Sequence, residues 1–231
     1  MPEERTSEVV AIVAARDEAD RITATIDALK EAFPGGRIIL ADDGSSDGTS
    51  DLALAHGAEV VSRRRPHGKG GSMTAAAATI APLTELSEPP VFLLCDGDLG
   101  GSAAALQRLV EAVRAGECDL AVGGFSKRLG GGFGVTLGFS RWAIERRCGY
   151  RAGAPISGQR AMRGSVLRAV VPFAPGYGME TAMTIDAVRA GFTVREYELD
   201  LEHRATGRSA AGFAHRAHQL SDIARAWWAR R

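Results

Sequence analysis

Short apolar runs alternate with longer amphipathic segments along the first half of the chain. Each run is aliphatic and β-branched, as buried strands are, and each is followed by a polar turn and a stretch of helix length. Because parallel strands need a crossover of that length, the alternation predicts an α/β fold, a mostly parallel sheet flanked by helices. The predicted strands span residues 8–14, 37–41, 58–62, 91–95 and 120–124.

Helices are predicted between these strands. They span residues 20–32, capped by Asp20, a segment ending near residue 55, residues 72–80 and residues 103–115. After residue 125 the weaker pattern predicts a helix over 139–147, a helix from about Glu180, a strand over 193–199 and a helix over 212–228. With no repeat and no long linker, we expect one domain over residues 1–231, in which the second half closes around the sheet of the first.

The charge balance is even, with 28 basic and 28 acidic residues in a chain of 231. Nucleic-acid binding normally leaves a basic excess, so this balance argues against such a partner. Three cysteines without paired metal spacing are typical of a reducing compartment. The polar first residues make no signal peptide, and no run reaches the roughly 20 apolar residues of a membrane span. We expect a cytoplasmic protein, soluble or at most peripheral to a membrane.

Acidic residues follow three of the predicted strands. Asp17 and Glu18 follow the first, Asp42 and Asp43 open the segment DDGSSDGT after the second, and Asp96-Gly97-Asp98 follows the fourth. Ligands of open parallel sheets bind beyond the carboxyl ends of the strands, so these groups meet at one edge. Such carboxylates repel one another unless a hard divalent cation binds them, which predicts a metal site at Asp96 and Asp98. The alternative is a plain turn that caps the next helix.

Two further segments fit a phosphate-bearing ligand. Asp42 and Asp43 come too early to cap the following helix, so one of them is a candidate acceptor for a base N–H, whereas Asp47 fits the structural capping role. Gly68-Lys69-Gly70 opens an alanine-rich helix, where backbone N–H groups and Lys69 favour a diphosphate. Gly97 lacks a Cβ and allows the backbone to approach a ribose or diphosphate closely.

Taken together, residues 14–18, 42–49, 68–70 and 96–98 resemble the inverting family 2 glycosyltransferases of GT-A fold. The resemblance implies transfer of a hexose from a UDP- or GDP-linked sugar with Mg²⁺ or Mn²⁺, and donor binding by the half before residue 126. By resemblance, the donor contacts are Ala14, Ala15, Glu18, Asp42, Asp43, Lys69, Asp96 and Gly97, and Asp96 and Asp98 bind the metal. The first motif departs from the family's PxxNE, because Ala14, Ala15, Arg16 and Asp17 precede Glu18.

In the second half, residues 156–160 and 176–180 look like acceptor-side segments of polyprenyl-phosphate sugar synthases and glucosyl-3-phosphoglycerate synthases. This resemblance implies a small phosphorylated molecule or a lipid phosphate as acceptor. Inverting transfer to a hydroxyl needs a carboxylate base, for which Glu180 is the candidate and Asp186 the reserve. The alternative for Glu180 is a first-turn helix carboxylate. His203 resembles a metal-binding imidazole, and a structural histidine is the alternative.

Other positions leave the partners open. Lys127, Arg160, Arg204 and Arg208 are candidates for an acidic acceptor, with plain surface arginines as the alternative. Trp227 and Trp228 fit either peripheral contact with the inner face of a membrane or packing of the last helix. A homodimer is compatible with the sequence. Two rival functions are a nucleotidyltransferase, which would carry a glycine-rich loop after the first strand, and a non-catalytic sugar-nucleotide-binding protein.

Overall fold

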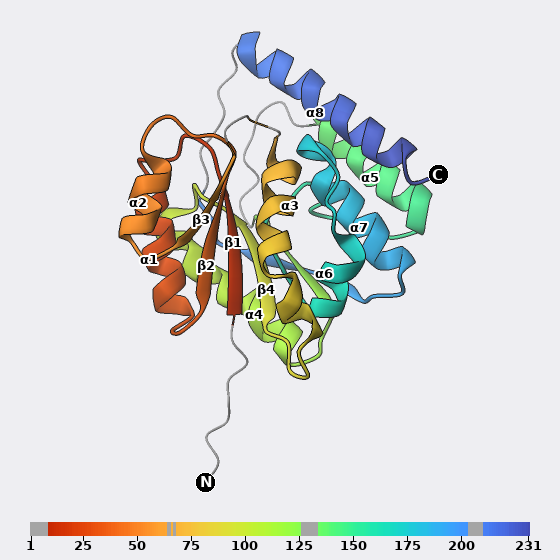
Figure 1. The fold of residues 1–231 in the computed structure, drawn as a ribbon. Helices are drawn as coiled ribbons and strands as arrows, with labels where there is room; N and C mark the ends of the chain where they lie inside the picture. Colours follow the sequence, from red (N-terminus) through yellow and green to blue (C-terminus); the bar gives the residue numbers. More distant parts are fainter. Residues whose placement is uncertain (1–8, 64–65, 67, 126–133, 203–209) are drawn as a thin grey trace.

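The computed structural model describes residues 9–63, 66, 68–125, 134–202 and 210–231. One seven-stranded sheet, in the order β3-β2-β1-β4-β6-β5-β7, runs through the molecule (Figure 1). Strands from both halves of the chain contribute to it. The strands are β1 (Val9–Ala15), β2 (Arg37–Asp42), β3 (Glu59–Ser62), β4 (Val91–Asp96), β5 (Leu120–Phe125), β6 (Arg160–Met162) and β7 (Val194–Leu199).

All neighbouring strands are parallel except at β6. β1 pairs in parallel with β2 and β4, and β5 does so with β7, whereas β6 runs antiparallel between β4 and β5. The predicted α/β class with a mostly parallel sheet is confirmed. β6 was not predicted, because a strand of three residues is too short to show a hydrophobic period.

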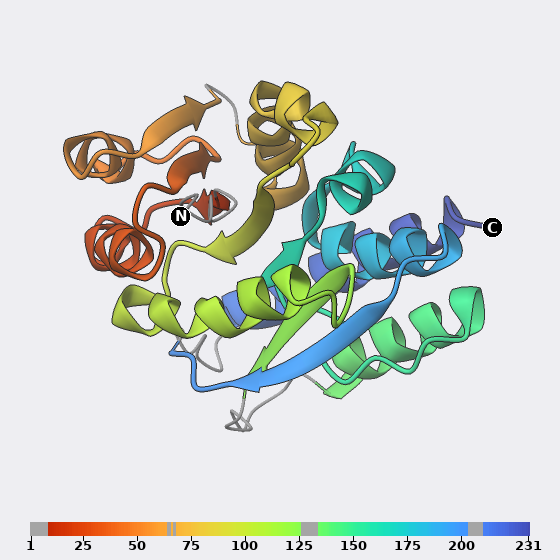
Figure 2. The same ribbon diagram turned by 90° about the horizontal axis from the view of Figure 1, so that it is seen from below.

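Helices cover both faces of the sheet, with α1, α2 and α4 on one face and α3, α6 and α7 on the other (Figure 2). α5 and α8 form an outer layer that packs on α7 and on each other. The helices are α1 (Ile22–Ala32), α2 (Thr49–Ala55), α3 (Lys69–Thr79), η1 (Ala81–Glu85), η2 (Gly100–Leu106), α4 (Gln107–Arg114), α5 (Gly134–Cys148), α6 (Gly164–Val170), η3 (Gly176–Gly178), α7 (Met179–Arg189) and α8 (Ala210–Trp228).

Strand β1 shows how the sequence builds two cores. Its residues alternate between faces: Val9, Ala11 and Val13 pack with α1 and α4, whereas Val10 and Ile12 pack with α3 and α7. Both sets are buried, so the strand reads as one continuous apolar run.

Most predicted elements are present with ends shifted by a few residues, and two predictions need correction. Asp20 does not cap the first helix, because α1 begins at Ile22 and the N–H groups of Arg21 and Ile22 both bond to the carbonyl of Glu18. The helix predicted over 103–115 is two segments, η2 and α4. Helix α6 was also missed.

Two further features concern the cysteines and the length of the helices. Cys95, Cys118 and Cys148 are all free thiols, and burial raises the pKa of Cys95 above its ordinary value, so this thiol is unreactive. Among the described helices, none combines the length and the apolar character that crossing a bilayer requires.

Candidate active site

The sheet register brings the three acidic turns to one edge. Ala15 at the end of β1 stands opposite Asp42 of β2, and Ala14 stands opposite Asp96 of β4. The turns continue this pairing, because Asp43 N donates to the Ala15 carbonyl at 3.1 Å and Gly97 N donates to the Ala14 carbonyl at 2.8 Å. The ends of β1, β2 and β4 therefore meet at one edge of the sheet, as predicted.

Side chains at the start of helix α1 bind the backbone of the Asp96-Gly97-Asp98 turn. Thr25 Oγ1 donates to the Gly97 carbonyl at 2.8 Å, and Arg21 Nη1 donates to the Asp98 carbonyl at 3.1 Å. A Cβ on Gly97 would lie 3.0 Å from the Cβ of Ala15. Close packing of the turn on β1 thus requires glycine at position 97. This packing is a reason for the glycine separate from the approach of a ligand that the sequence predicts.

The carboxylate of Asp42 is used inside the protein. Asp42 is 1% exposed, and it accepts hydrogen bonds from Ser45 N at 3.0 Å, from Ser45 Oγ and from Ser62 Oγ at 2.8 Å. Burial would raise the pKa of Asp42, but these hydrogen bonds together lower it below its ordinary value. Asp42 is therefore a charged anchor for the loop that follows β2.

Asp43 links that loop to the start of helix α3, because Asp43 Oδ2 accepts from Gly68 N at 3.0 Å. Asp47 has the structural role expected of it: Oδ1 accepts from Thr49 N and Oδ2 from Ala19 N, both at 3.0 Å. Glu18 N donates to Thr49 Oγ1 at 2.9 Å. These bonds hold the turn after β1, which carries Glu18, against the turn after β2.

Lys69 joins the donor side of the predicted site to Glu180. Its Nζ lies 2.5 Å from Asp96 Oδ1 and 2.8 Å from Glu180 Oε1. Helix α3 begins at Lys69, three residues before the predicted start, and α7 carries Glu180 in its first turn. Burial would lower the pKa of Lys69, but the charges of Asp96 and Glu180 outweigh it and raise the pKa above its ordinary value. Lys69 is therefore an ammonium ion held by two carboxylates.

Small residues make room for this contact. A Cβ on Gly70 would collide with the carbonyl of Ala174, and a Cβ on Gly158 would collide with Lys69 Nζ and the Asp96 carboxylate. Gly158 thus keeps the space around the ion pair open, and Gly70 lets the first turn of α3 pack on the segment before α7.

Gln159 is a site residue whose role the sequence analysis missed. Its Nε2 donates to Asp96 Oδ2 at 2.7 Å, and its Oε1 accepts from Asp96 N at 3.1 Å. Residues 156–160 were predicted to serve the acceptor side, whereas Gln159 binds the carboxylate of Asp96 at the end of β4, a residue predicted to contact the donor. Only the antiparallel insertion of β6 beside β4 brings them together, and a three-residue strand gives no sequence signal.

Arg160 is 1% exposed, which is unusual for an arginine. Its Nε donates to the Ser157 carbonyl at 2.9 Å and its Nη1 to Thr184 Oγ1 at 3.0 Å, while Nη2 is buried without a hydrogen-bond partner. Burial lowers its pKa to about 10, against opposing charges that include Glu180.

The other sequence candidates lie elsewhere. Asp186, the reserve base, pairs with Arg230, whose Nη2 lies 2.5 Å from Asp186 Oδ2. His203, Lys127, Arg204 and Arg208 lie outside the described residues.

Asp96 already accepts the ammonium of Lys69 at Oδ1 and the Nε2 of Gln159 at Oδ2. Asp98 follows two residues later on the same turn, and Mg²⁺ is typically bound by one or two carboxylates together with substrate phosphates. The described residues contain no cluster of three or more acidic, histidine or cysteine side chains that would bind a metal alone. A metal here would therefore depend on oxygens from the ligand.

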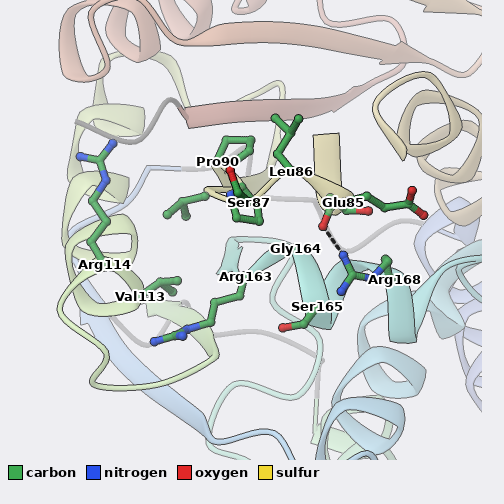
Figure 3. Close-up of a pocket in the computed structure, with 13 residues that line it drawn as sticks. Glu85, Leu86, Ser87, Pro90, Val113, Arg114, Arg163, Gly164, Ser165 and Arg168 are labelled. Carbon is green, nitrogen blue, oxygen red and sulfur yellow. Dashed lines mark hydrogen bonds between the residues drawn. The ribbon is translucent and has the colours of Figure 1, made fainter. Parts of the chain in front are cut away.

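A cavity of about 940 Å³ lies at the other end of β4 (Figure 3). Its wall includes Val91, the first residue of β4, together with Arg114, Arg163 and Arg168. Arg168 donates to the Thr84 carbonyl and Arg163 pairs with Asp119. The predicted site residues lie at the Asp96 end of the strand, so the chemistry places the candidate active site there and not in this cavity.

Comparison with known proteins gives a consistent result. The family model "Glycosyl transferase family 2" matches residues 10–168, a range that contains the candidate donor residues and ends before Glu180. Undecaprenyl-phosphate mannosyltransferase of Micrococcus luteus is 32% identical over 219 residues, covering 87% of this chain and 86% of that protein. Glucosyl-3-phosphoglycerate synthase of Mycolicibacterium paratuberculosis is 30% identical over 200 residues, covering 76% of this chain and 58% of that protein.

The fold agrees as well. The crystal structure of glucosyl-3-phosphoglycerate synthase from Mycobacterium tuberculosis in complex with phosphoglyceric acid matches with a TM-score of 0.79 at 25% identity, covering 97% of this chain and 80% of that one. The expected GT-A fold is thereby confirmed. Since the family model matches more than half of the chain and the Micrococcus relative aligns with most of it, this protein belongs to glycosyl transferase family 2.

Proposed function

We propose that the protein transfers a sugar from a UDP- or GDP-linked donor to a hydroxyl or phosphate-bearing acceptor, with a divalent metal ion. The observation that carries the proposal is the position of Lys69 between Asp96 and Glu180. This cation joins the carboxylate expected to bind the donor to the carboxylate expected to act on the acceptor. Within this proposal, the donor binds to the half before residue 126 and the acceptor to the half after it.

The donor would lie along the edge formed by β1, β2 and β4. Glu18 and Asp43 would meet the base, Ala14 and Ala15 would contact the donor at the end of β1, and Asp42 fixes the loop. Lys69 and the first N–H groups of α3 face the diphosphate, which is favoured there by the ammonium charge and by the helix N-terminus. Asp96 and Asp98 would hold the metal.

When bound, the metal would neutralise charge on the departing nucleoside diphosphate. The bond from the anomeric carbon to the diphosphate oxygen breaks as the bond to the acceptor oxygen forms on the opposite face, which inverts the configuration. With a hydroxyl acceptor, the proton passes to the carboxylate of Glu180. An ionised phosphate acceptor attacks directly and has no proton to give, so Glu180 would then act by charge and position alone.

The relatives support both acceptor chemistries. One is named for undecaprenyl phosphate and another for 3-phosphoglycerate, and a phosphate group is common to the two acceptors. Crystal structures of the Mycobacterium tuberculosis synthase contain Mn²⁺ with UDP, and Mg²⁺ with UDP. These facts support a nucleoside diphosphate donor with Mg²⁺ or Mn²⁺ for this protein.

Thermal melting of the purified protein tests donor binding directly. UDP, GDP and their sugars are added with Mn²⁺, with Mg²⁺ or with EDTA, because a ligand that binds the native state raises the midpoint by mass action. We expect a metal-dependent rise with one base only. A midpoint unchanged by every diphosphate would overturn the proposal.

Transfer is then measured with the donor so identified, using undecaprenyl phosphate and 3-phosphoglycerate as acceptors. Formation of a glycosylated product with either acceptor supports the transferase. Donor binding without transfer or hydrolysis would favour the non-catalytic sugar-nucleotide-binding protein. Release of pyrophosphate from a nucleoside triphosphate and a sugar phosphate would favour the nucleotidyltransferase.

A further inference from the structure

The outer edge where α5 meets α8 carries an unusual set of aromatic residues. We call it the α5/α8 seam, formed by Val135, Phe139, Trp142, Trp227 and Trp228. The Trp142 ring stacks on that of Phe139 at 5.5 Å within α5 and lies 5.2 Å from the tilted ring of Trp227, so the two helices meet through aromatic rings. α5 and α8 lie side by side in Figure 1, outside α7.

Much of the α5/α8 seam is exposed to solvent. Val135 is 74% exposed, Trp142 48% and Trp228 58%, and together they are half of the large hydrophobic residues that are exposed in the described part of the chain. Val135, Phe139, Trp142 and Arg146 are spaced by four, three and four residues, which aligns them along one face of α5. Val135, Trp142 and Trp228 therefore form the exposed part of the seam, while Phe139 and Trp227 are partly covered.

Positive charge surrounds the seam. Residues 134–148 and 219–231 contain six arginines, of which Arg225 pairs with Asp222 and Arg230 pairs with Asp186. The other four, at positions 141, 146, 147 and 231, stand against Glu145 alone within these two ranges, although the whole chain is neutral. Arg147 lies 4.0 Å over the Trp227 ring, and Arg231 lies over Trp228. Cations thus stand beside the tryptophans themselves.

We propose that the α5/α8 seam binds the surface of a bilayer that contains anionic phospholipid. Tryptophan favours the boundary between headgroups and acyl chains, since its ring is apolar and its N–H is polar. Arginines near that boundary are attracted by anionic headgroups. A protein partner would fit the aromatic seam as well, but the excess of arginine around it selects a negatively charged surface.

Helix α8, which carries Trp227 and Trp228, is in contact with the segment that leads to Glu180. Tyr177 N donates to Asp222 Oδ2 at 3.2 Å, and a Cβ on Gly178 would lie 2.7 Å from the Cβ of Ala226. η3 therefore packs directly on α8. The inference goes beyond the proposed function, and the experiments that test it do not depend on sugar transfer.

Tryptophan fluorescence tests the proposal without labels, because all three tryptophans of the chain, Trp142, Trp227 and Trp228, belong to the seam. Vesicles of phosphatidylglycerol should shift the emission to shorter wavelength as the rings leave water, and lipids brominated on the acyl chain should quench it. Vesicles of phosphatidylcholine should give a much smaller shift. An emission spectrum unchanged by phosphatidylglycerol vesicles overturns the proposal.

Variants separate the aromatic contribution from the electrostatic one by flotation with the same vesicles. The double variant Trp142→Ser/Trp228→Ser should bind at least about tenfold more weakly. Arg146→Gln/Arg231→Gln should bind about 25-fold more weakly at low salt, since about 1 kcal/mol per arginine is a factor of about five each. Leu86→Ser, which removes a side chain 52% exposed at the other end of the sheet, is the matched control and should bind as wild type.

A second copy of the chain is the competing occupant of the seam. If light scattering shows a dimer that the tryptophan variant converts to a monomer, and the wild-type protein does not float with phosphatidylglycerol vesicles, the seam is a dimer interface and the proposal is wrong. Wild-type flotation that is equal with both lipids, or unchanged in both double variants, also overturns it.

Discussion

The ammonium group of Lys69 lies 2.5 Å from Asp96 Oδ1 and 2.8 Å from Glu180 Oε1. This pairing holds β4 and α7 together through one positive charge. It also keeps two carboxylates at a short separation that they could not maintain alone, because like charges at such a distance repel.

Replacing Lys69 by Met keeps the aliphatic stem and removes the charge. We expect Lys69→Met to lower the free energy of unfolding by about 3 kcal/mol, the lower end for a broken buried pair, since Asp96 is partly exposed. The affinity for the nucleoside diphosphate should fall as well. Urea unfolding and donor titration check the two effects. Lys30→Met, which removes an exposed lysine bonded to the His56 carbonyl, is the control.

Gln159 should act as a positioning residue for Asp96. In Gln159→Leu the bond from Asp96 N and the bond to Asp96 Oδ2 are lost, while Lys69 still binds Oδ1, so the carboxylate is held less firmly. We expect transfer to slow by about 10- to 100-fold and the half-saturating Mn²⁺ concentration to rise, as for other partners of metal ligands. Gln107→Leu removes an equivalent amide from α4 and should leave both values unchanged. A rate loss that excess Mn²⁺ does not relieve would argue for a purely structural role.

Asp98→Ala tests the metal assignment. The backbone bond from Arg21 to the Asp98 carbonyl does not need the side chain, so the turn should persist and the melting midpoint of the free protein should change little. The metal-dependent rise of the midpoint with nucleoside diphosphate should disappear. Asp51→Ala, in the first turn of α2, is the matched acidic control. An undiminished rise in Asp98→Ala would remove Asp98 as a ligand.

Glu180→Gln separates donor binding from chemistry. The amide keeps the shape of the side chain and cannot accept a proton, so donor affinity should stay within about threefold. Transfer to a hydroxyl acceptor should fall by about 10²- to 10⁴-fold. With a phosphate acceptor the fall should be smaller, because no proton is removed. Equal rates in the variant and the wild type with a hydroxyl acceptor would exclude Glu180 as the base.

Asp42 should make the free energy of unfolding depend on pH. Its pKa is lowered in the folded protein, where hydrogen bonds from Ser45 and Ser62 outweigh burial, so its contribution is present above the ordinary pKa of about 3.9 and is lost as the pH falls through the folded value. We expect Asp42→Asn to cost about 1–3 kcal/mol at neutral pH and much less at about pH 3. Urea unfolding at both pH values measures the difference, and a cost independent of pH would contradict the assignment.

Local patterns were sufficient to predict the donor side of the site. The apolar runs predicted the strands, and the residues after them, Asp42, Asp43, Asp96 and Asp98, could be placed at one edge because parallel strands end together. The role of Asp47 followed from its distance to the next helix. The donor, metal and base roles of these residues remain proposals, since the register shows where they lie and not what they bind.

Contacts between distant segments could not be predicted in this way. Gln159 reaches Asp96 only because β6 inserts antiparallel between β4 and β5. A three-residue strand is too short for its sequence to predict this strand order. The approach of Lys69 to Glu180 depends on the packing of α3 against the segment before α7, where Gly70 meets Ala174. Asp20 failed as a cap because the Glu18 carbonyl already binds the first N–H groups.

The position of β6 also constrains how the protein can be made. Until residues 160–162 have left the ribosome, β4 and β5 each present an open edge to other chains, although both strands were synthesised much earlier. Exposed edges of this kind invite aggregation. A fragment ending at residue 125 would contain most of the candidate donor residues and still be an aggregating species, so the two halves cannot be expressed apart and mixed. Nascent-chain proteolysis should accordingly show protection of β4 only once the strand that separates it from β5 has been translated.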